Sequence, residues 1–336
     1  MVANVSADLA NSIYNMQEEP TVDFTVAIRV YNSGDRIAEI LEKLLHQTDT
    51  EEINWEIVIV DNNSTDNTAQ IIQQYQAQWC KPYSLRYFLE TRQGAVFARA
   101  RAIREAKGQY IGFLDDDNFP CSTWVSAAYT FGQAHPQVGA YGSRIQGRFD
   151  VEPPKNFERI QSFLALKERG ETANQYDPSS LSLPAGAGLV VRKQVWLNSV
   201  PERLNLQGPV GGKLTAKGED FEALLHIGQQ GWEIWYNPEM KIDHHIPGWR
   251  LERDYLISLI HNVGLTICQL RMINAKNWQK PIIMLRIIVG NSRRIIQHWM
   301  RYRGGIQEDV VLSCEMAFYW SSLISPFVYL KQQIMH

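Results

Sequence analysis

The chain has 336 residues, of which 45% are hydrophobic and 21% are charged, and its formal net charge is −3 at pH 7. This composition is that of a globular protein and excludes a chain that is disordered over long stretches. The small net charge gives no electrostatic reason to expect nucleic acid as a partner.

The charge is unevenly distributed along the chain. Residues 246–336 hold 11 Lys and Arg against 5 Asp and Glu, and the remainder holds 22 against 31. This asymmetry indicates an anionic surface as a partner for the C-terminal part. The four cysteines form no CxxC pair, so a reducing cytosol is the simplest compartment. Residues 1–21 lack the features of a signal peptide and are expected to form a flexible lead-in.

Strands and helices alternate over the first 115 residues. Short apolar runs predict buried parallel strands, and apolar residues at helical spacing predict the helices between them. This order predicts an α/β fold with a doubly wound, mostly parallel sheet, whose ligands bind beyond the carboxyl ends of the strands. The predicted strands are 24–30, 55–60, 85–89 and 110–114, and the predicted helices begin near residues 37, 66 and 94.

Later elements are predicted less regularly. The polar, Pro-containing residues 149–183 are expected to form a loop and a helix, and residues 185–191 a strand. Residues 232–236 and 240–242 are expected to be two short strands, after an amphipathic helix that opens at Gly218. The C-terminal stretch is apolar in three segments, but none is an uncharged run of the ~20 residues that span a bilayer.

Three adjacent carboxylates, Asp115, Asp116 and Asp117, follow the fourth predicted strand directly. Such carboxylates repel one another, so a cation that neutralises them favours their folded arrangement. Mg²⁺ and Mn²⁺ prefer oxygen ligands and commonly bind together with diphosphate oxygens. The triplet therefore predicts a site for a divalent metal and a nucleotide diphosphate, with a solvated acidic turn as the alternative.

Other candidate residues each have a structural alternative. Asp61 ends the second strand and can accept hydrogen bonds from a base or ribose, but its surroundings also suit a turn and N-cap. Glu219 and Asp220 open a helix, where a carboxylate can act as general base or simply complement the helix dipole. His244 can complete a metal site or be an ordinary hydrogen-bonded histidine. Arg99 suits phosphate, or a solvated helix face.

These pieces, in this order, resemble glycosyltransferase family 2, whose members have the GT-A fold. The resemblance covers roughly residues 22–250. It rests on 26–32, 57–66, 94–99, 108–117, 186–188, 218–220 and 236–244. Two positions depart from the family pattern: Arg29 stands where Pro is common, and Ala100 where Asn is usual. More loosely, the chain is similar to cyanobacterial glycosyltransferases of hormogonium-type exopolysaccharide assembly.

The resemblance implies a role for each matching residue. Asp220 would be the catalytic base of an inverting transfer, supported by Glu219. Asp117, with Asp115 and His244, would bind Mn²⁺ or Mg²⁺, and His245 is an adjacent competitor for the role of His244. The nucleotide pocket would be formed by Val30, Tyr31, Asn32, Asp61, Arg99, Asp115 and Asp116.

The expected function is sugar transfer from a nucleotide-sugar, a UDP-sugar by analogy with common donors, to a saccharide or lipid-linked hydroxyl acceptor in polysaccharide biosynthesis. Trp249 and Arg250 follow the site in sequence and are candidates for the acceptor cleft. A nucleotidyltransferase is disfavoured, since no Gly- and Lys-rich loop follows the first strand. A non-catalytic nucleotide-sugar-binding or scaffold protein of a membrane complex is the alternative from another class.

The domain prediction is a lead-in at 1–21, a catalytic domain at 22–250 and a helical region at 251–336. Within 281–303, Arg286, Arg293, Arg294, Gln297 and Arg301 fall on one helical face, and Leu285, Ile288, Ile295, Ile296 and Trp299 largely on the other. A basic amphipathic helix suits an anionic membrane surface. The alternative is a helix packed on the catalytic domain with its basic face solvated. The expected location is cytoplasmic, with peripheral contact at the inner face of the plasma membrane.

Overall fold

A computed structural model describes residues 22–206 and 218–335 of the chain. The first four strands of this described part are rich in apolar residues. β1 (Phe24–Val30) pairs in parallel with β2 (Trp55–Asp61) and β4 (Tyr110–Asp115), and β2 pairs in parallel with β3 (Ser84–Leu89). The predicted parallel strands are confirmed, and their carboxyl ends lie at one edge of the sheet. The lead-in expected at residues 1–21 lies outside the described residues.

The described strands form one nine-stranded mixed sheet in the order β3-β2-β1-β4-β8-β6-β9-β5, with β7 beside β9. β8 runs antiparallel to β4 and β6, and β6 runs parallel to β9. The short β5 is antiparallel to β9, which brings the residues just after β4 against β9. The bounds are β5 (Asn118–Pro120), β6 (Val138–Phe149), β7 (Asn174–Gln175), β8 (Val190–Arg192) and β9 (Glu233–Ile246).

Three segments differ from the sequence-based expectation. Residues 149–183 contain short 3₁₀ turns and β7 in place of the expected α-helix. The two strands expected within 232–242 are the single strand β9, because an irregular register opposite Ser143 and Arg144 lets the strand pass Pro238 without ending. The strand expected from Ala185 begins only at Val190, and the small residues before it approach helix α7 (Glu219–Gln229).

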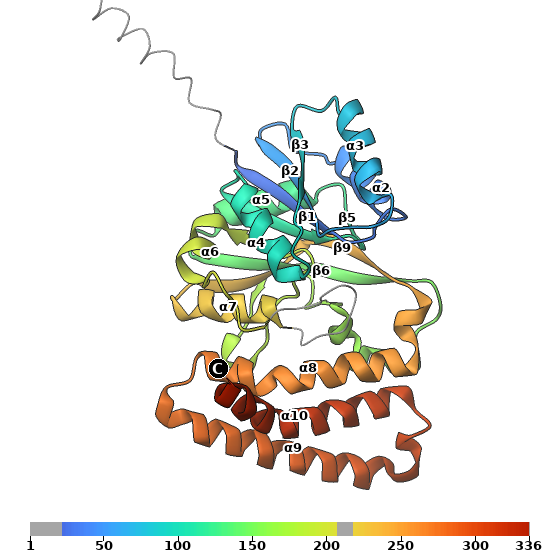
Figure 1. Ribbon diagram of the computed structural model, residues 1–336, viewed down its shortest axis with the longest axis vertical. Coiled ribbons are helices and arrows are strands. Elements are labelled where there is room, and N and C mark those ends of the chain that lie inside the picture. Colours follow the sequence, from blue (N-terminus) through green and yellow to red (C-terminus); the bar gives the residue numbers. More distant parts are fainter. Residues whose placement is uncertain (1–21, 207–217, 336) are drawn as a thin grey trace, which may run out of the picture.

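Helices cover both faces of the sheet (Figure 1). One buried cluster joins Ile28 and Leu114 to α2, α3 and α5, and a second joins Ala27 and Phe113 to α4, α6 and α7. Successive strand residues point to opposite faces, so neighbours such as Ala27 and Ile28 belong to different clusters. The bounds are α2 (Ile37–Leu45), α3 (Thr68–Gln78), α4 (Ala95–Glu105), α5 (Trp124–Ala134), α6 (Lys193–Ser199) and α7 (Glu219–Gln229).

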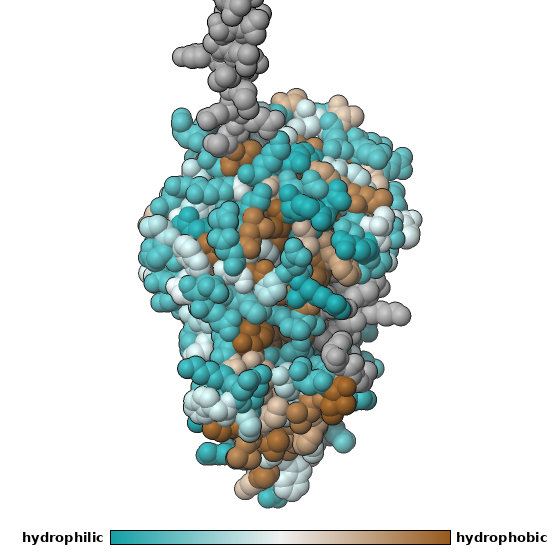
Figure 2. Space-filling view, turned by 60° about the vertical axis from the view of Figure 1, so that its left-hand side comes forward, coloured by the Kyte–Doolittle hydropathy of each residue, from teal (hydrophilic) through white to brown (hydrophobic). Residues whose placement is uncertain are grey.

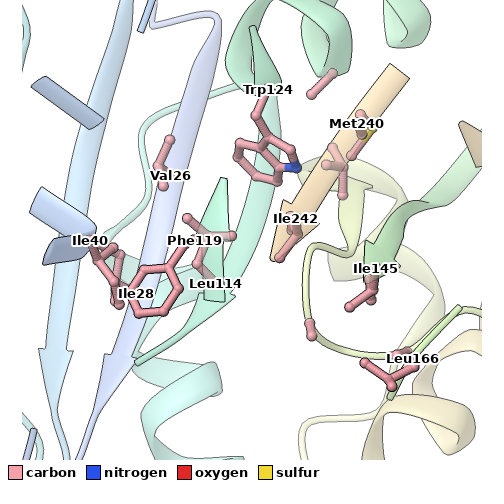
Figure 3. Close-up of a cluster of buried hydrophobic side chains, with 14 of the residues drawn as sticks. Val26, Ile28, Ile40, Leu114, Phe119, Trp124, Ile145, Leu166, Met240 and Ile242 are labelled. Carbon is pink, nitrogen blue, oxygen red and sulfur yellow. The ribbon is translucent and has the colours of Figure 1, made fainter. Parts of the chain in front are cut away.

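The first cluster holds the two halves of the sheet together. Figure 3 shows Trp124 of α5 between the β1 side, where Val26 lies, and the β9 side, where Met240 and Ile242 lie. Trp124 is fully buried, and its Nε1 donates a hydrogen bond of 3.0 Å to Oγ of Ser143 on β6. A buried Trp whose N–H has a partner adds packing area without leaving a polar group unsatisfied.

Three long helices end the chain: α8 (Arg253–Ile273), α9 (Lys280–Tyr302) and α10 (Val310–Met335). They lie side by side as a layer at one end of the molecule, which confirms the predicted C-terminal helical extension (Figure 1). By length and mean hydropathy, 1.4 and 1.2, α8 and α10 are apolar enough to cross a membrane. Less than half of the most apolar window of each helix, 44% and 39%, is buried within the protein.

Candidate active site

The acidic triplet sits in the turn between β4 and β5. The backbone N–H of Asp115 donates to Oδ1 of Asn118 at 3.0 Å, and Nδ2 of Asn118 donates to Oδ1 of Asp117 at 2.9 Å. Asn118 therefore fixes the turn from inside. The three carboxylates are held by three different sets of partners.

Asp115 and Asp116 face residues of β1 and of the segment that follows it. Asp115 forms an ion pair with Arg29, and Asp116 accepts from the hydroxyl of Ser33 and, at 2.8 Å, from Nη2 of Arg36. Burial and the neighbouring charge of Asp117 raise the pKa of Asp116 to about 6, although Arg36 and Ser33 lower it. Adjacent, partly buried carboxylates resist being charged together, as expected of a site suited to a cation.

Asp117 meets the end of β9. Nε2 of His244 lies 3.2 Å from Oδ2 of Asp117, and Nη1 of Arg250 donates to the same oxygen at 2.8 Å. Burial raises the pKa of Asp117, but His244 and Arg250 outweigh it and hold that pKa below its usual range. His245 instead pairs with Asp150 at 2.9 Å. Residues 244 and 245 alternate on the strand, so only His244 points at the acidic triplet.

The ligand atoms at Asp117 and His244 fit a divalent cation such as Mn²⁺, because one carboxylate oxygen and one imidazole nitrogen converge there. Nδ1 of His244 is buried and has no hydrogen-bond partner among the described residues, whereas Nε2 faces Asp117 and also lies 3.3 Å from Nη1 of Arg250. No group of three or more His, Cys, Asp or Glu in the described part of the chain converges on one point, and Asp115 turns to Arg29 instead. Phosphate oxygens and water would then complete the coordination, as Mg²⁺ and Mn²⁺ commonly allow.

Asp220 lies in the first turn of α7, opposite Gly186. A Cβ added at Gly186 would lie 1.8 Å from Oδ2 of Asp220, so only glycine leaves room for this carboxylate. Asp220 forms an ion pair with Arg99, which is buried. Burial, together with the charge of Arg29, lowers the pKa of Arg99 to about 9. The predicted base therefore has a positioned cationic partner, and Glu219 beside it is also buried.

One cavity of about 1300 Å³ joins these groups. Its walls include the whole acidic triplet, His244 and the helix-start acids at 219 and 220. Val30, Tyr31, Trp249 and Arg250 also line it. Side chains that come from five separate segments of the sequence are thus brought to one space.

Three predicted nucleotide-pocket residues do not line this cavity: Asn32, Asp61 and Arg99. Asp61 is 2% exposed, and its carboxylate accepts from the backbone of Ser64 at 2.8 Å and from the hydroxyl of Tyr87 at 2.9 Å. Asn32 accepts from the backbone of Thr65 at 2.8 Å. In this arrangement Asn32 stabilises the turn after β1, and Asp61 stabilises the turn after β2. For Asp61 this is the turn-forming role that the sequence offers as the alternative to a base contact.

The family model of "Glycosyl transferase family 2" matches residues 25–195, just over half of the chain. The chain belongs to glycosyl transferase family 2. The predicted family is thereby confirmed, and the acidic triplet and Gly186 lie within the matched range.

Curated proteins with related sequence are also named as glycosyltransferases. A putative teichuronic acid biosynthesis glycosyltransferase, TuaG of Bacillus subtilis, is 38% identical over 88 residues, which cover 26% of this chain and 33% of that protein. The UDP-Glc:alpha-D-GlcNAc-diphosphoundecaprenol beta-1,3-glucosyltransferase WfaP of Escherichia coli is 31% identical over 149 residues, 42% of this chain and 57% of that protein. The family 2 chain thus matches only a third to somewhat over half of these relatives.

Solved structures support the fold. The mannosyltransferase PcManGT of Pyrobaculum calidifontis, in complex with GDP-Man and Mn²⁺, superposes with a TM-score of 0.56 over 95% of this chain and 94% of that one, at 17% identity. At this identity the likeness concerns the fold alone. The predicted GT-A architecture of this family 2 member is confirmed.

Sequence reasoning missed several residues that shape the family 2 site. The sequence marks Arg29 only as a departure from the family pattern, yet Arg29 forms the ion pair with Asp115. Its Nε and Nη1 are buried with no hydrogen-bond partner among the described residues, so they remain able to meet an anion. Ser33 and Arg36 hold Asp116. An Arg just before a helix carries no sequence signal that links it to a carboxylate so far along the chain.

Proposed function

We propose that this protein is a metal-dependent, inverting glycosyltransferase that moves a sugar from a nucleotide-diphosphate sugar to a hydroxyl acceptor in polysaccharide biosynthesis. The observation that carries the proposal is the single cavity that joins Asp117 and His244 to Asp220. Transfer requires a group that stabilises the departing diphosphate and a base that deprotonates the acceptor, and both must face the same sugar. We assign catalysis to residues 22–250.

The donor side of the cavity combines carboxylates and cations. Asp117 and His244 are proposed to hold Mn²⁺ or Mg²⁺, which when bound neutralises the charge that builds on the diphosphate. Asp115 and Asp116, with Val30 and Tyr31, are proposed to face the nucleoside. Arg250 donates to Oδ2 of Asp117, so a cation held there would compete with it, and Arg250 would then be placed to contact phosphate or acceptor.

Asp220 is the proposed base. The acceptor hydroxyl oxygen attacks the anomeric carbon from the face opposite the diphosphate, the bond from that carbon to the diphosphate oxygen breaks, and the hydroxyl proton passes to Asp220. One displacement of this kind inverts the anomeric configuration. Arg99 acts as a positioning residue, since its ion pair fixes the carboxylate that Gly186 leaves room for.

The proposed donor is a UDP-sugar, and the proposed acceptor is a saccharide or a lipid-linked sugar. The name of the E. coli relative WfaP specifies UDP-glucose and a diphosphoundecaprenol acceptor. Trp249 is exposed at the cavity and offers an aromatic face to a sugar ring, so we assign it to the acceptor side.

The proposed location is the cytoplasm, with residues 251–336 in peripheral contact with the inner face of the plasma membrane. Support comes from the outer face of α9, whose apolar residues are exposed to solvent and not packed on the catalytic domain; Leu285 is 62% exposed and Trp299 58%. Figure 2 displays hydrophobic residues gathered at the end of the molecule where Figure 1 has the C-terminal helices. The exposed apolar residues of α9 are Ile282, Leu285, Val289, Ile296, Trp299 and Met300.

The test is a thermal-shift screen of nucleoside diphosphates with and without Mn²⁺. Selective binding to the folded state stabilises it by about 2.7 kcal/mol at a ligand concentration 100 times Kd. We expect one nucleotide, UDP on this proposal, to raise Tm only when Mn²⁺ is present. A Tm that no nucleotide changes, or that changes equally without the metal, would contradict the proposal.

A further inference from the structure

The cavity does not stop at Asp220 but continues between the C-terminal helices. A Cβ added at Gly218, two residues before Asp220, would lie 3.7 Å from Oγ1 of Thr266 and 3.7 Å from Cδ1 of Leu270 on α8. α8 is therefore in contact with the segment that carries the proposed base. We call this extension the helix-lined part of the cavity; α8 contributes Val263, Thr266, Ile267, Leu270 and Arg271 to it.

α9 presents one continuous face to the helix-lined part. The residues recur at intervals of three or four, which places them on one side of a helix, roughly opposite the exposed apolar face. Phe318 and Ser322, also four apart, line the cavity from α10. The lining residues of α9 are Ile283, Arg286, Ile287, Gly290, Asn291 and Arg294.

The lining combines apolar side chains with a purely cationic charge. Val263, Ile267 and Phe318 are among the apolar walls. Arg271, Arg286 and Arg294 supply charge, and no described Asp or Glu of α8, α9 or α10 lines the cavity. Arginine binds phosphate through two parallel hydrogen bonds, so this chemistry suits a phosphate attached to an apolar chain.

Two buried polar atoms in this part have no partner among the described residues. Asn291 is 6% exposed; its Nδ2 donates to the carbonyl of Ile287 at 2.8 Å, but its Oδ1 is unpaired. Ser322 is 1% exposed and its Oγ is unpaired. Leaving such groups unsatisfied is costly, so they indicate a ligand with polar groups at this depth. The Ser322 hydroxyl can donate to a phosphate oxygen, and Oδ1 of Asn291 can accept from a sugar hydroxyl.

We infer that the helix-lined part of the cavity binds the acceptor as a lipid phosphate, with the apolar chain among α8, α9 and α10, the phosphate at Arg286 and Arg294, and the acceptor sugar toward Asp220. This inference rests on the proposed function and specifies its acceptor.

The experiment measures binding of farnesyl phosphate to the full chain by calorimetry, with EDTA present so that Asp117 holds no cation. Farnesol and inorganic phosphate are the comparison probes, because each keeps only one half of the chemistry. We expect farnesyl phosphate to bind at least about tenfold more tightly than either. Equal binding of inorganic phosphate would overturn the lipid site.

Three variants locate the site. Arg286→Gln combined with Arg294→Gln should weaken binding of farnesyl phosphate about tenfold or more, whereas Arg293→Gln should not, because Arg293 is as exposed as the other two but does not line the cavity. Gly290→Leu should block binding, since a Cβ there meets no atom within 4 Å and the larger side chain would extend into the lined space while favouring the helix. Arg293→Gln weakening binding as much as the pair, or Gly290→Leu binding normally, would overturn the inference.

A parallel measurement separates this inference from the proposed function. Wild-type protein is assayed for metal-dependent hydrolysis of a nucleotide-sugar, in which the sugar passes to water and the nucleoside diphosphate is released. This reaction needs no lipid. Release without farnesyl phosphate binding overturns the lipid site and leaves the proposed function standing.

Discussion

Nε2 of His244 lies 3.2 Å from Oδ2 of Asp117, although the two residues are far apart in the chain. The contact exists because β5, which begins one residue after Asp117, pairs antiparallel with β9 and sets Asn118 opposite His244. The sheet itself therefore assembles the candidate metal ligands.

Asp117→Ala and His244→Ala should each remove most of the Mn²⁺-dependent Tm rise given by UDP. Each variant deletes one of the two proposed protein ligands. The Tm rise should fall further in Asp117→Ala, because this variant also removes the negative charge that attracts the cation. His245→Ala is the matched control, since that ring faces Asp150. A His245→Ala variant that loses the metal response while His244→Ala keeps it would reverse the assignment.

Asp220→Asn should leave donor binding nearly intact and lower kcat for transfer at least about 100-fold, because an amide cannot accept the acceptor proton. The comparison is nucleotide binding by calorimetry against transfer rate. Asp49→Asn, an exposed carboxylate in a left-handed turn that asparagine tolerates, is the control. Full transfer by Asp220→Asn would exclude Asp220 as the base.

Gly186→Ala should lower transfer strongly, because the new methyl group would overlap the carboxylate of Asp220 and push it from its place. The cost in unfolding free energy should be about 1–3 kcal/mol, as for an overpacked site. Activity and denaturant unfolding are measured together. Gly304→Ala, where a Cβ meets no atom within 4 Å, should change neither, and a normal rate in Gly186→Ala would refute the steric argument.

Leu285→Gln and Trp299→Gln should weaken sedimentation with vesicles of anionic phospholipid, and should leave the fold intact because both side chains are exposed. Each removes apolar area that would enter the lipid, at about 25 cal/mol per Å². Leu197→Gln, an exposed leucine on α6, is the matched control. Equal sedimentation of all variants, or binding only to neutral vesicles, would contradict membrane contact through α9.

The sequence predicted the first half of the sheet well, because β1, β2 and β4 are buried apolar runs that end in polar turns. Asp115–Asp117 were found for the same reason. The sequence predicts two strands where β9 is one. Pro238 cannot donate a hydrogen bond to a neighbouring strand, and β9 continues past it because the pairing with β6 is irregular there. The contacts of Arg29 and Arg36 depend on tertiary packing, which has no local pattern. Asp61 suits both a turn and a base contact, and its hydrogen bonds with Ser64 in the turn and Tyr87 on the adjacent strand favour the turn.

The orientation of α9 also depended on tertiary structure. The two faces of the helix were visible in the sequence, but the apolar side normally packs inward. Here Ile287, Asn291 and His298 are the buried residues, while Leu285 and Trp299 are exposed. The neighbouring helices α8 and α10 decide this, and their packing could not be derived from residues 281–303 alone.

The central claim is that one cavity brings a metal-held diphosphate and a base to the same sugar. The most direct measurement is release of nucleoside diphosphate from a UDP-sugar, with Mn²⁺ added or removed by EDTA, for the wild type and for Asp220→Asn. We predict release by the wild type only with Mn²⁺, and a transfer rate in Asp220→Asn at least about 100-fold lower when an acceptor is supplied. Binding of the nucleotide-sugar without any metal-dependent release, in any of the common donors tested, would contradict this account and favour a non-catalytic binding protein.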